Sequence, residues 1–212
     1  MIYEFRTYDL KHGALAEVEK RYAEAYEHRK KFSELAAFWH TEIGPLNQII
    51  HVWPYKDLEE RSRIRAASVK EKVWPPAIGE FIVGMRSEIM IPAPFSPLIT
   101  PGKIGPYFEI RTYTYPMGAL PGIMENWEKA LPDRVKLSPL CLACYSELGA
   151  LNKWVNIWPF ATLDQRKAVR DRAKEMGVWP PSVVAAREGR KSTPYLVQEN
   201  KIVMPAAFSP LQ

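Results

Sequence analysis

A long internal repeat is the feature that most constrains the fold of this chain of 212 residues. The stretch 42–55, EIGPLNQIIHVWPY, recurs at 147–160 as ELGALNKWVNIWPF, which is an offset of 105 positions from Glu42 to Glu147. The same offset carries the motif that begins at Glu4 onto Glu109, and no gap is needed in between. Self-similarity of this kind means that one structural unit occurs twice, so the two halves should adopt the same fold and the sequence of each half is separate evidence for it.

The residue pattern of each half predicts a β-α-β-β-α-β unit, the ferredoxin-like arrangement. In the first half we expect strand 2–8, helix 15–31, strands 35–43 and 47–53, a helix that starts at 58 and ends before Trp74, and strand 81–91. Proline disfavours helix for the residue before it, which is why the run Trp74–Pro76 should end the second helix. In the second half, Pro132 is expected to stop or kink the first helix early.

Two such units predict an α+β fold in which tandem ferredoxin-like (βαββαβ) domains pack sheet to sheet. Helices cover one face of each sheet, so the bare face must meet another layer, and a second copy supplies it. The Pro- and Gly-rich link Ile99–Pro106 places the domains at 1–99 and 106–212. Between Phe95 and Phe208 the offset rises to 113, so the second half contains eight extra residues within Ser182–Asn200. We expect this insertion to be a lid or an oligomer contact.

The composition excludes several classes of protein. The net charge of +5 is spread over helices that interleave both signs, which argues against a nucleic-acid partner. No apolar run approaches the roughly 18 residues of a membrane span, and no leader precedes the first strand, so we expect a cytoplasmic protein without a membrane partner. Cys141 and Cys144 lie together in a predicted strand, where they are interpreted as inert core thiols.

Four motifs together resemble the NIPSNAP family, and they appear in both halves. They are Glu4-Phe-Arg-Thr-Tyr8, Glu42-x-Gly-x-Leu-Asn47 before a strand that ends in Trp53, Leu58-Glu-Glu-Arg61, and a closing Phe-Ser-Pro-Leu. The resemblance implies a dimeric α/β barrel, related in architecture to small cofactor-free oxygenases and to haem-binding barrels. It implies little about activity, because the molecular function of the family is poorly established.

Alternation along the strands assigns a polar set to the face away from the helices, inside the barrel. In the first half it comprises Glu4, Arg6, Tyr8, His40, Glu42, Asn47, His51 and Trp53; in the second, Glu109, Arg111, Tyr113, Tyr145, Glu147, Asn152, Asn156 and Trp158. Covered charges need partners. One interpretation is that Arg6 with Glu42, and Arg111 with Glu147, form ion pairs that fix strand order. The other is that the set binds an anionic or polar ligand.

All histidines fall in the first half, so imidazole chemistry must be one-sided. Their counterparts in the second half are not histidines: Asn156 replaces His51 and Tyr145 replaces His40. A two-residue connection at 45–46 would place His40 opposite His51, with Cβ atoms about 5 Å apart. With Glu42 they could hold a divalent metal or supply a general base, although a hydrogen-bonded core pair is the alternative.

Three functional hypotheses follow, and none requires a cofactor. The first is a protein, binding or catalytic, that takes a small and partly apolar molecule in or beside the barrel. The second is a noncatalytic oligomeric scaffold, and the third, by fold analogy alone, is a cofactor-free monooxygenase. We expect a homo-oligomer. The candidates for ligand binding are Arg6, Tyr8, His40, Glu42, Asn47, His51, Trp53, Arg111, Tyr145 and Asn156, and the recurring tryptophans either pack the core or line an apolar pocket.

Overall fold

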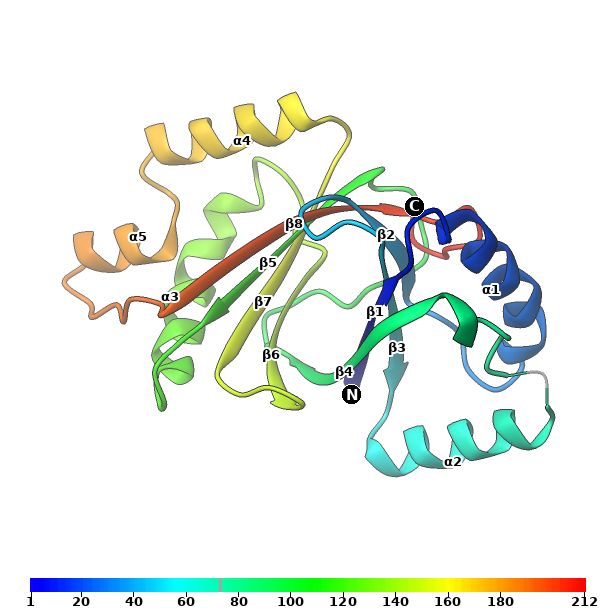
Figure 1. The fold of residues 1–212 in the computed structure, drawn as a ribbon. Helices are drawn as coiled ribbons and strands as arrows, with labels where there is room; N and C mark the ends of the chain where they lie inside the picture. The colour runs from blue at the N-terminus through cyan, green and yellow to red at the C-terminus, as the bar shows by residue number, and fades with distance from the viewer. Residues whose placement is uncertain (73) are drawn as a thin grey trace.

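Eight antiparallel strands close into a barrel, and the helices lie outside it, in the computed structural model, which describes residues 1–72 and 74–212 (Figure 1). The first half contains β1 (Ile2–Leu10), α1 (Leu15–Arg29), β2 (Ala37–Ile43), β3 (Gln48–Tyr55), α2 (Leu58–Lys70), a short 3₁₀ turn (Gly79–Phe81) and β4 (Ile82–Pro92). The second contains β5 (Tyr107–Thr114), α3 (Leu120–Arg134), β6 (Leu142–Leu148), β7 (Lys153–Phe160), α4 (Leu163–Glu175), α5 (Pro181–Arg187) and β8 (Val197–Pro205).

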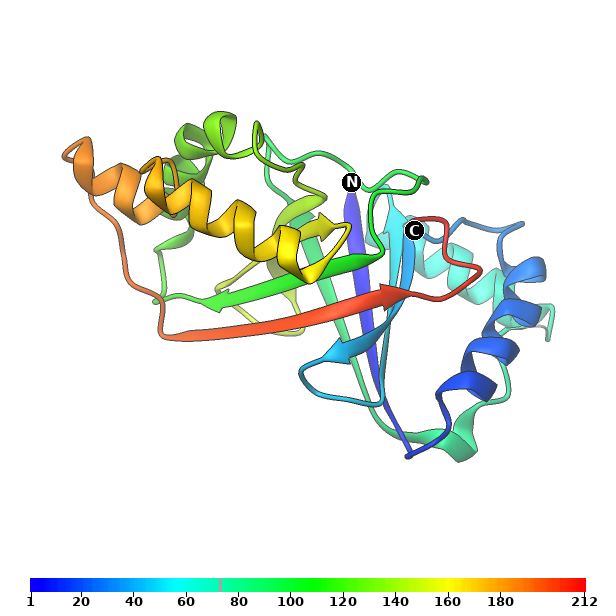
Figure 2. The same cartoon turned by 90° about the horizontal axis from the view of Figure 1, so that it is seen from above.

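The strand order is β1-β3-β2-β8-β5-β7-β6-β4, and the circle then returns to β1. Each half therefore contributes four adjacent strands in ferredoxin-like order, and the halves are joined where β2 pairs with β8 and β4 pairs with β6. Figures 1 and 2 show α1 and α2 beside the first-half strands and α3, α4 and α5 beside those of the second half. The predicted tandem α+β barrel is confirmed, and it closes within a single chain.

Both faces of the sheet carry apolar residues, because both faces are covered. A cluster supplied by all eight strands, with Phe5, Trp39 and Ile110 among its members, fills the barrel interior. Two further clusters lie between strands and helices, where Tyr22 of α1 and Trp127 of α3 pack against the outer faces of the two halves. The alternation of β1 is as predicted, but the face assigned to its polar residues is wrong. Even-numbered residues such as Glu4 and Tyr8 lie beneath the helices.

Each half ends with a Phe-Ser-Pro-Leu segment that packs against the other half. The hydroxyl of Ser209 accepts a hydrogen bond from the backbone N–H of Phe38 in β2 at 2.9 Å, and Ser96 accepts one from Ala143 in β6 at 2.8 Å. Phe208 correspondingly joins the cluster of the first half. The repeated closing motif thus ties the two halves together crosswise.

The helix ends follow local chemistry. Asp57 and Thr162 are N-caps that accept the backbone N–H of Glu60 and Gln165 at the starts of α2 and α4. The prediction that Pro132 stops α3 early is wrong, because the helix continues to Arg134. Proline has no backbone N–H to donate, but Pro132 lies in the last turn of α3, so the helix loses this hydrogen bond only at its end. Among the described residues, no helix is long and apolar enough to cross a bilayer.

Candidate functional site

A pocket lies between sheet and helices in each half of the molecule. The first, of about 460 Å³, is lined by β1, β3, α1, α2 and the segment 74–79. The second, of about 830 Å³, uses many of the equivalent positions of the other half, and residues 192–195, from the segment that contains the insertion, form part of its wall. Equivalent linings include Arg6 and Arg111, and Arg65 and Arg170, at the offset of the sequence repeat. The duplication has therefore produced two related sites.

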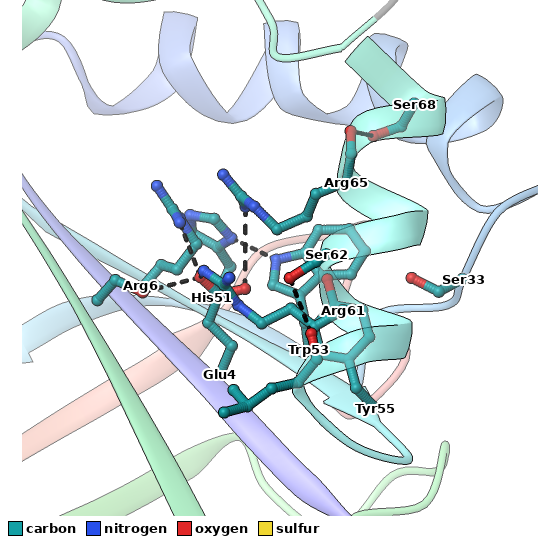
Figure 3. A network of polar contacts seen from close by, with 12 residues as sticks. Glu4, Arg6, Ser33, His51, Trp53, Tyr55, Arg61, Ser62, Arg65 and Ser68 are labelled. Atoms are coloured by element: carbon teal, nitrogen blue, oxygen red, sulfur yellow. Dashed lines mark hydrogen bonds and ion pairs between the residues drawn. The ribbon is translucent and has the colours of Figure 1, made fainter. Parts of the chain in front are cut away.

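A buried carboxylate surrounded by arginines, two of which line the first pocket, lies on β1 (Figure 3). Glu4 on β1 is 0% exposed and accepts hydrogen bonds from Arg6 at 2.8 Å, Arg61 at 2.6 Å and Ser87 at 2.8 Å. Arg65, one turn along α2 from Arg61, lies 3.8 Å from its other oxygen. Burial by itself would raise the pKa of the Glu4 carboxyl, but the hydrogen bonds from Arg61 and Ser87 and the charge of Arg6 lower it from 4.5 to about 2.

The second half repeats this arrangement around Glu109. Arg111 lies 2.9 Å from one carboxylate oxygen, Arg166 lies 2.5 Å from the same oxygen, and Arg170 lies 3.7 Å from the other. Burial raises the pKa of Glu109, and the arginines, led by Arg166, bring it below its usual range. Each site thus sets three guanidinium groups against one carboxylate.

A fourth arginine in each half adds to the excess of positive charge. Arg29 on α1 and Arg134 on α3 are 1% and 2% exposed, and their guanidinium carbons lie over Trp53 at 4.4 Å and Trp158 at 4.1 Å. In the described part of the chain, no carboxylate oxygen lies within 4.0 Å of either guanidinium. Burial lowers the pKa of Arg29, and burial with the charge of Arg170 lowers that of Arg134 to about 10.

His51 has a structural hydrogen bond rather than an open coordination position. The indole Nε1 of Trp53 donates to its Nδ1 at 2.7 Å, which leaves the proton of the neutral ring on Nε2, 3.3 Å from the Tyr22 hydroxyl. Burial, reinforced by the charge of Arg6, lowers the pKa of His51 well below its usual value. In the second half Trp158 donates to the side-chain oxygen of Asn156 at 2.8 Å. Histidine and asparagine therefore perform the same task, which is to accept an indole N–H.

The structure separates the sequence-predicted candidates into distinct groups. Arg6, Tyr8, His51 and Trp53 line the first pocket, and Arg111 lines the second. Asn156 is buried but does not line the second pocket, and Tyr145 is partly buried against the cluster that contains Trp127. Glu42 and Asn47 are exposed at the β2–β3 connection.

The predicted pairings within the candidate set are wrong. Arg6 binds Glu4 and not Glu42, and the predicted pair of Arg111 with Glu147 is likewise replaced by one with Glu109. His51 lies opposite Phe38, and His40 faces Ile49, so the register differs by two positions from the predicted one. The connection spans 44–47 and uses the positive φ of Gly44 (118°) and Asn47 (56°).

His40 and Glu42 take no part in a metal site with His51. The Nδ1 atom of His40 lies 2.7 Å from Glu19 of α1, and this hydrogen bond raises the pKa of the imidazole. The described residues contain no group of three or more His, Cys, Asp or Glu side chains that could hold a metal ion.

Sequence reasoning missed the arginines that come from the helices. Arg29, Arg61 and Arg65 lie on helices, so the alternation of the strands does not connect them with Glu4. A signal for them exists, because each recurs as arginine at the repeat offset, at 134, 166 and 170. A basic residue retained at three equivalent helical positions of both halves indicates a shared role for those helices.

The family model of NIPSNAP matches residues 3–97 and again 108–210. The chain belongs to the NIPSNAP family. Human protein NipSnap homolog 3A is 31% identical over 223 aligned positions, which cover 100% of this chain and 86% of that protein. Mouse NipSnap homolog 3B is 33% identical, with coverage of 99% and 85%. These relatives therefore match both NIPSNAP repeats, and they identify the family without defining a reaction.

A solved structure shows the same barrel at low sequence identity. A monooxygenase-like protein from Lactobacillus acidophilus superposes with a TM-score of 0.62 over 97% of this NIPSNAP chain and 94% of its own, at 12% identity. This comparison supports the dimeric α/β barrel architecture and nothing about chemistry.

Proposed function

We propose that this NIPSNAP protein binds a small organic anion with an apolar or aromatic body in the pockets between sheet and helices. The observation that carries the proposal is the charge imbalance at each pocket. Three arginines contact a single buried carboxylate, Glu4 or Glu109, and a fourth lies nearby without a carboxylate partner. Burying unmatched positive charge is costly, and a bound anion would remove that cost.

The chemistry of the lining supports a ligand of two parts. Guanidinium groups offer a planar fork of donors that suits a carboxylate or a phosphate. In the first pocket Arg6, Arg29 and Arg65 lie beside Tyr8, Trp53 and Trp74, so charged and aromatic surfaces meet in one cavity. The second pocket combines Arg111 and Arg170 with Tyr115, Trp127 and Trp179. An anionic head with a flat, apolar body fits both sets of walls.

Binding is better supported than catalysis by the comparison of the halves. Among the described lining residues of both pockets, His51 is the only histidine, and its acceptor nitrogen is occupied by the Trp53 indole. The counterpart Asn156 makes the same hydrogen bond without any capacity to titrate. The feature that both halves retain is the arginine set. The scaffold hypothesis predicts internally balanced pairs, and the surplus of guanidinium groups argues against it.

Calorimetric titration with benzoate, indole-3-acetate and phenyl phosphate at low ionic strength tests the proposal. Arg65→Gln and Arg170→Gln remove one pocket arginine from each half without touching the closest contacts of the carboxylates. We expect the double variant to weaken binding by about tenfold or more, since a charge-assisted hydrogen bond contributes about 1.5–3 kcal/mol. Arg63→Gln is the matched control, because Arg63 is on the same helix with a side chain that is 71% exposed. Failure of all three probes to bind, or equal losses in the control, would refute the proposal.

A further inference from the structure

The end of the barrel at which the hairpin connections lie contains a third cavity, of about 750 Å³. None of its lining residues belongs to either sheet–helix pocket. Its apolar part is formed by side chains of the interior cluster, from β1, β3, β4, β5 and β7: Phe5, Ile50, Met90, Ile110 and Val155. Its polar part includes the cations Arg86, Lys153 and Lys201 and the carboxylates Glu88 and Glu199. An apolar floor with a charged rim is the form of a site for an amphipathic molecule.

Two positions of this cavity are related by the duplication but have different chemistry. Glu88 pairs with Phe5 across β4 and β1, and Lys201 pairs with Ile110 across β8 and β5, so Glu88 and Lys201 are counterparts. In the first position Lys153 makes an ion pair with Glu88 at 2.8 Å. In the second, Lys201 donates to the amide oxygen of Gln48 at 2.9 Å. One lysine is neutralised by a carboxylate and the other is not.

Among the described cations of this cavity, Lys201 is the one without an ion pair, although Glu199, two positions away on β8, also lines the cavity. Arg86 pairs with Asp9 at 3.1 Å, and Lys153 pairs with Glu88. Among the described residues, no carboxylate oxygen lies within 4.0 Å of the Lys201 ammonium. Burial and the charge of Arg86 lower the pKa of Lys201, and the more distant charges of Glu199, Asp9 and Glu88 offset part of that effect. Of its three N–H donors, Gln48 accounts for one.

We propose that the barrel end is a second ligand site, which binds a small monocarboxylate with an aliphatic tail. The Lys201 ammonium receives the carboxylate, and the tail lies on the apolar floor formed by Phe5, Ile50 and Met90. The site is present once per chain, because its counterpart position is already filled by the side chain of Glu88. It does not depend on the arginine pockets, so the chain has room for two ligands of different shape.

Titration of octanoate by calorimetry tests this site with three variants. Lys201→Gln should weaken octanoate binding by about tenfold or more through loss of the charge-assisted contact. Gln48→Glu should give a similar loss although Lys201 remains, because it supplies the carboxylate that Glu88 supplies to Lys153. Glu88→Gln should strengthen binding, because it frees Lys153 as a second cation. Thermal unfolding of each variant verifies that the barrel is intact.

The results separate this site from the arginine pockets. Octanoate binding that survives Arg65→Gln with Arg170→Gln but is lost in Lys201→Gln supports the barrel-end site, whatever the fate of the aromatic probes. If neither Lys201→Gln nor Gln48→Glu changes the affinity for octanoate, the proposal of a barrel-end site is overturned. Absence of binding at millimolar octanoate would overturn it as well. Binding that is lost only in the arginine variants would assign octanoate to the sheet–helix pockets and would also overturn the barrel-end site.

Discussion

Glu4→Gln is the perturbation that tests the structural account of the arginine cluster most directly. The side chain keeps its size but loses the charge that Arg6, Arg61 and Arg65 share. A carboxyl pKa that falls from 4.5 to about 2 on folding corresponds to roughly 3 kcal/mol of stability at neutral pH. Removal of one partner from a buried ion pair costs a comparable amount, about 3–5 kcal/mol. We expect a loss of about 3 kcal/mol.

Urea unfolding followed by tryptophan fluorescence measures this loss as a lower midpoint at unchanged slope. The pH dependence gives a second, independent check. Since the folded pKa of Glu4 is depressed, its contribution is complete above about pH 4.5 and is lost as the pH falls toward about 2. The difference between the wild-type protein and Glu4→Gln should therefore shrink over that interval.

Glu42→Gln is the control, because sequence reasoning assigns Glu42 to Arg6 whereas the structure leaves it exposed. This variant should unfold within about 0.5 kcal/mol of the wild type, as surface substitutions usually do. Equal destabilisation by the two variants, or a Glu4→Gln effect that persists at pH 2, would refute the account of the buried cluster.

Three further predictions concern hydrogen bonding, backbone geometry and thiol chemistry. His51→Asn should cost less than about 1 kcal/mol in urea unfolding, because the other half uses asparagine to accept the same indole N–H, whereas His51→Leu should cost about 1–3 kcal/mol by leaving that donor unpaired. Gly149→Ala should lower the melting temperature more than Gly118→Ala: both have positive φ, but only at Gly149 does the added Cβ meet a backbone oxygen, at 2.7 Å. Cys141 and Cys144 should resist iodoacetamide until the protein is unfolded, because burial raises both thiol pKa values, that of Cys141 to about 12.

The repeat makes the order of the elements predictable from the sequence. The sequence does not predict which face of the sheet the helices cover. Alternation correctly separates Phe5 from Glu4 and Arg6, but it cannot say which face meets the helices when both faces are covered. The sequence pattern predicts the polar residues on the face away from the helices, whereas Glu4 and Arg6 lie on the other face in the structure. In the structure the arginines of α2 provide the partners that make a charged residue such as Glu4 tolerable beneath a helix. That information lies in the helix sequence and becomes meaningful only when the two elements are brought together.

The predicted register of the β2–β3 hairpin is wrong because β2 also pairs with a strand of the other half. A tight connection at 45–46 would keep β2 and β3 paired to their ends, but β2 leaves β3 after His40 and continues along β8. A strand of the other half therefore determines where the hairpin opens. Pairing between segments more than 150 positions apart, such as His40 with Met204, cannot be read from the pattern of either strand alone.

The two junctions between the halves of the barrel, β2 with β8 and β4 with β6, have an evolutionary consequence. If this barrel were assembled from two identical chains, symmetry would place the same residue at both copies of every position, and a substitution at one would be imposed on the other. With β2 joined to β8 and β4 to β6 inside one polypeptide, each copy can change alone. Imidazole against amide at 51 and 156, and carboxylate against ammonium at 88 and 201, are differences of that kind. When both halves belong to one chain, the two equivalent sites no longer have to be identical, and selection can change each of them separately.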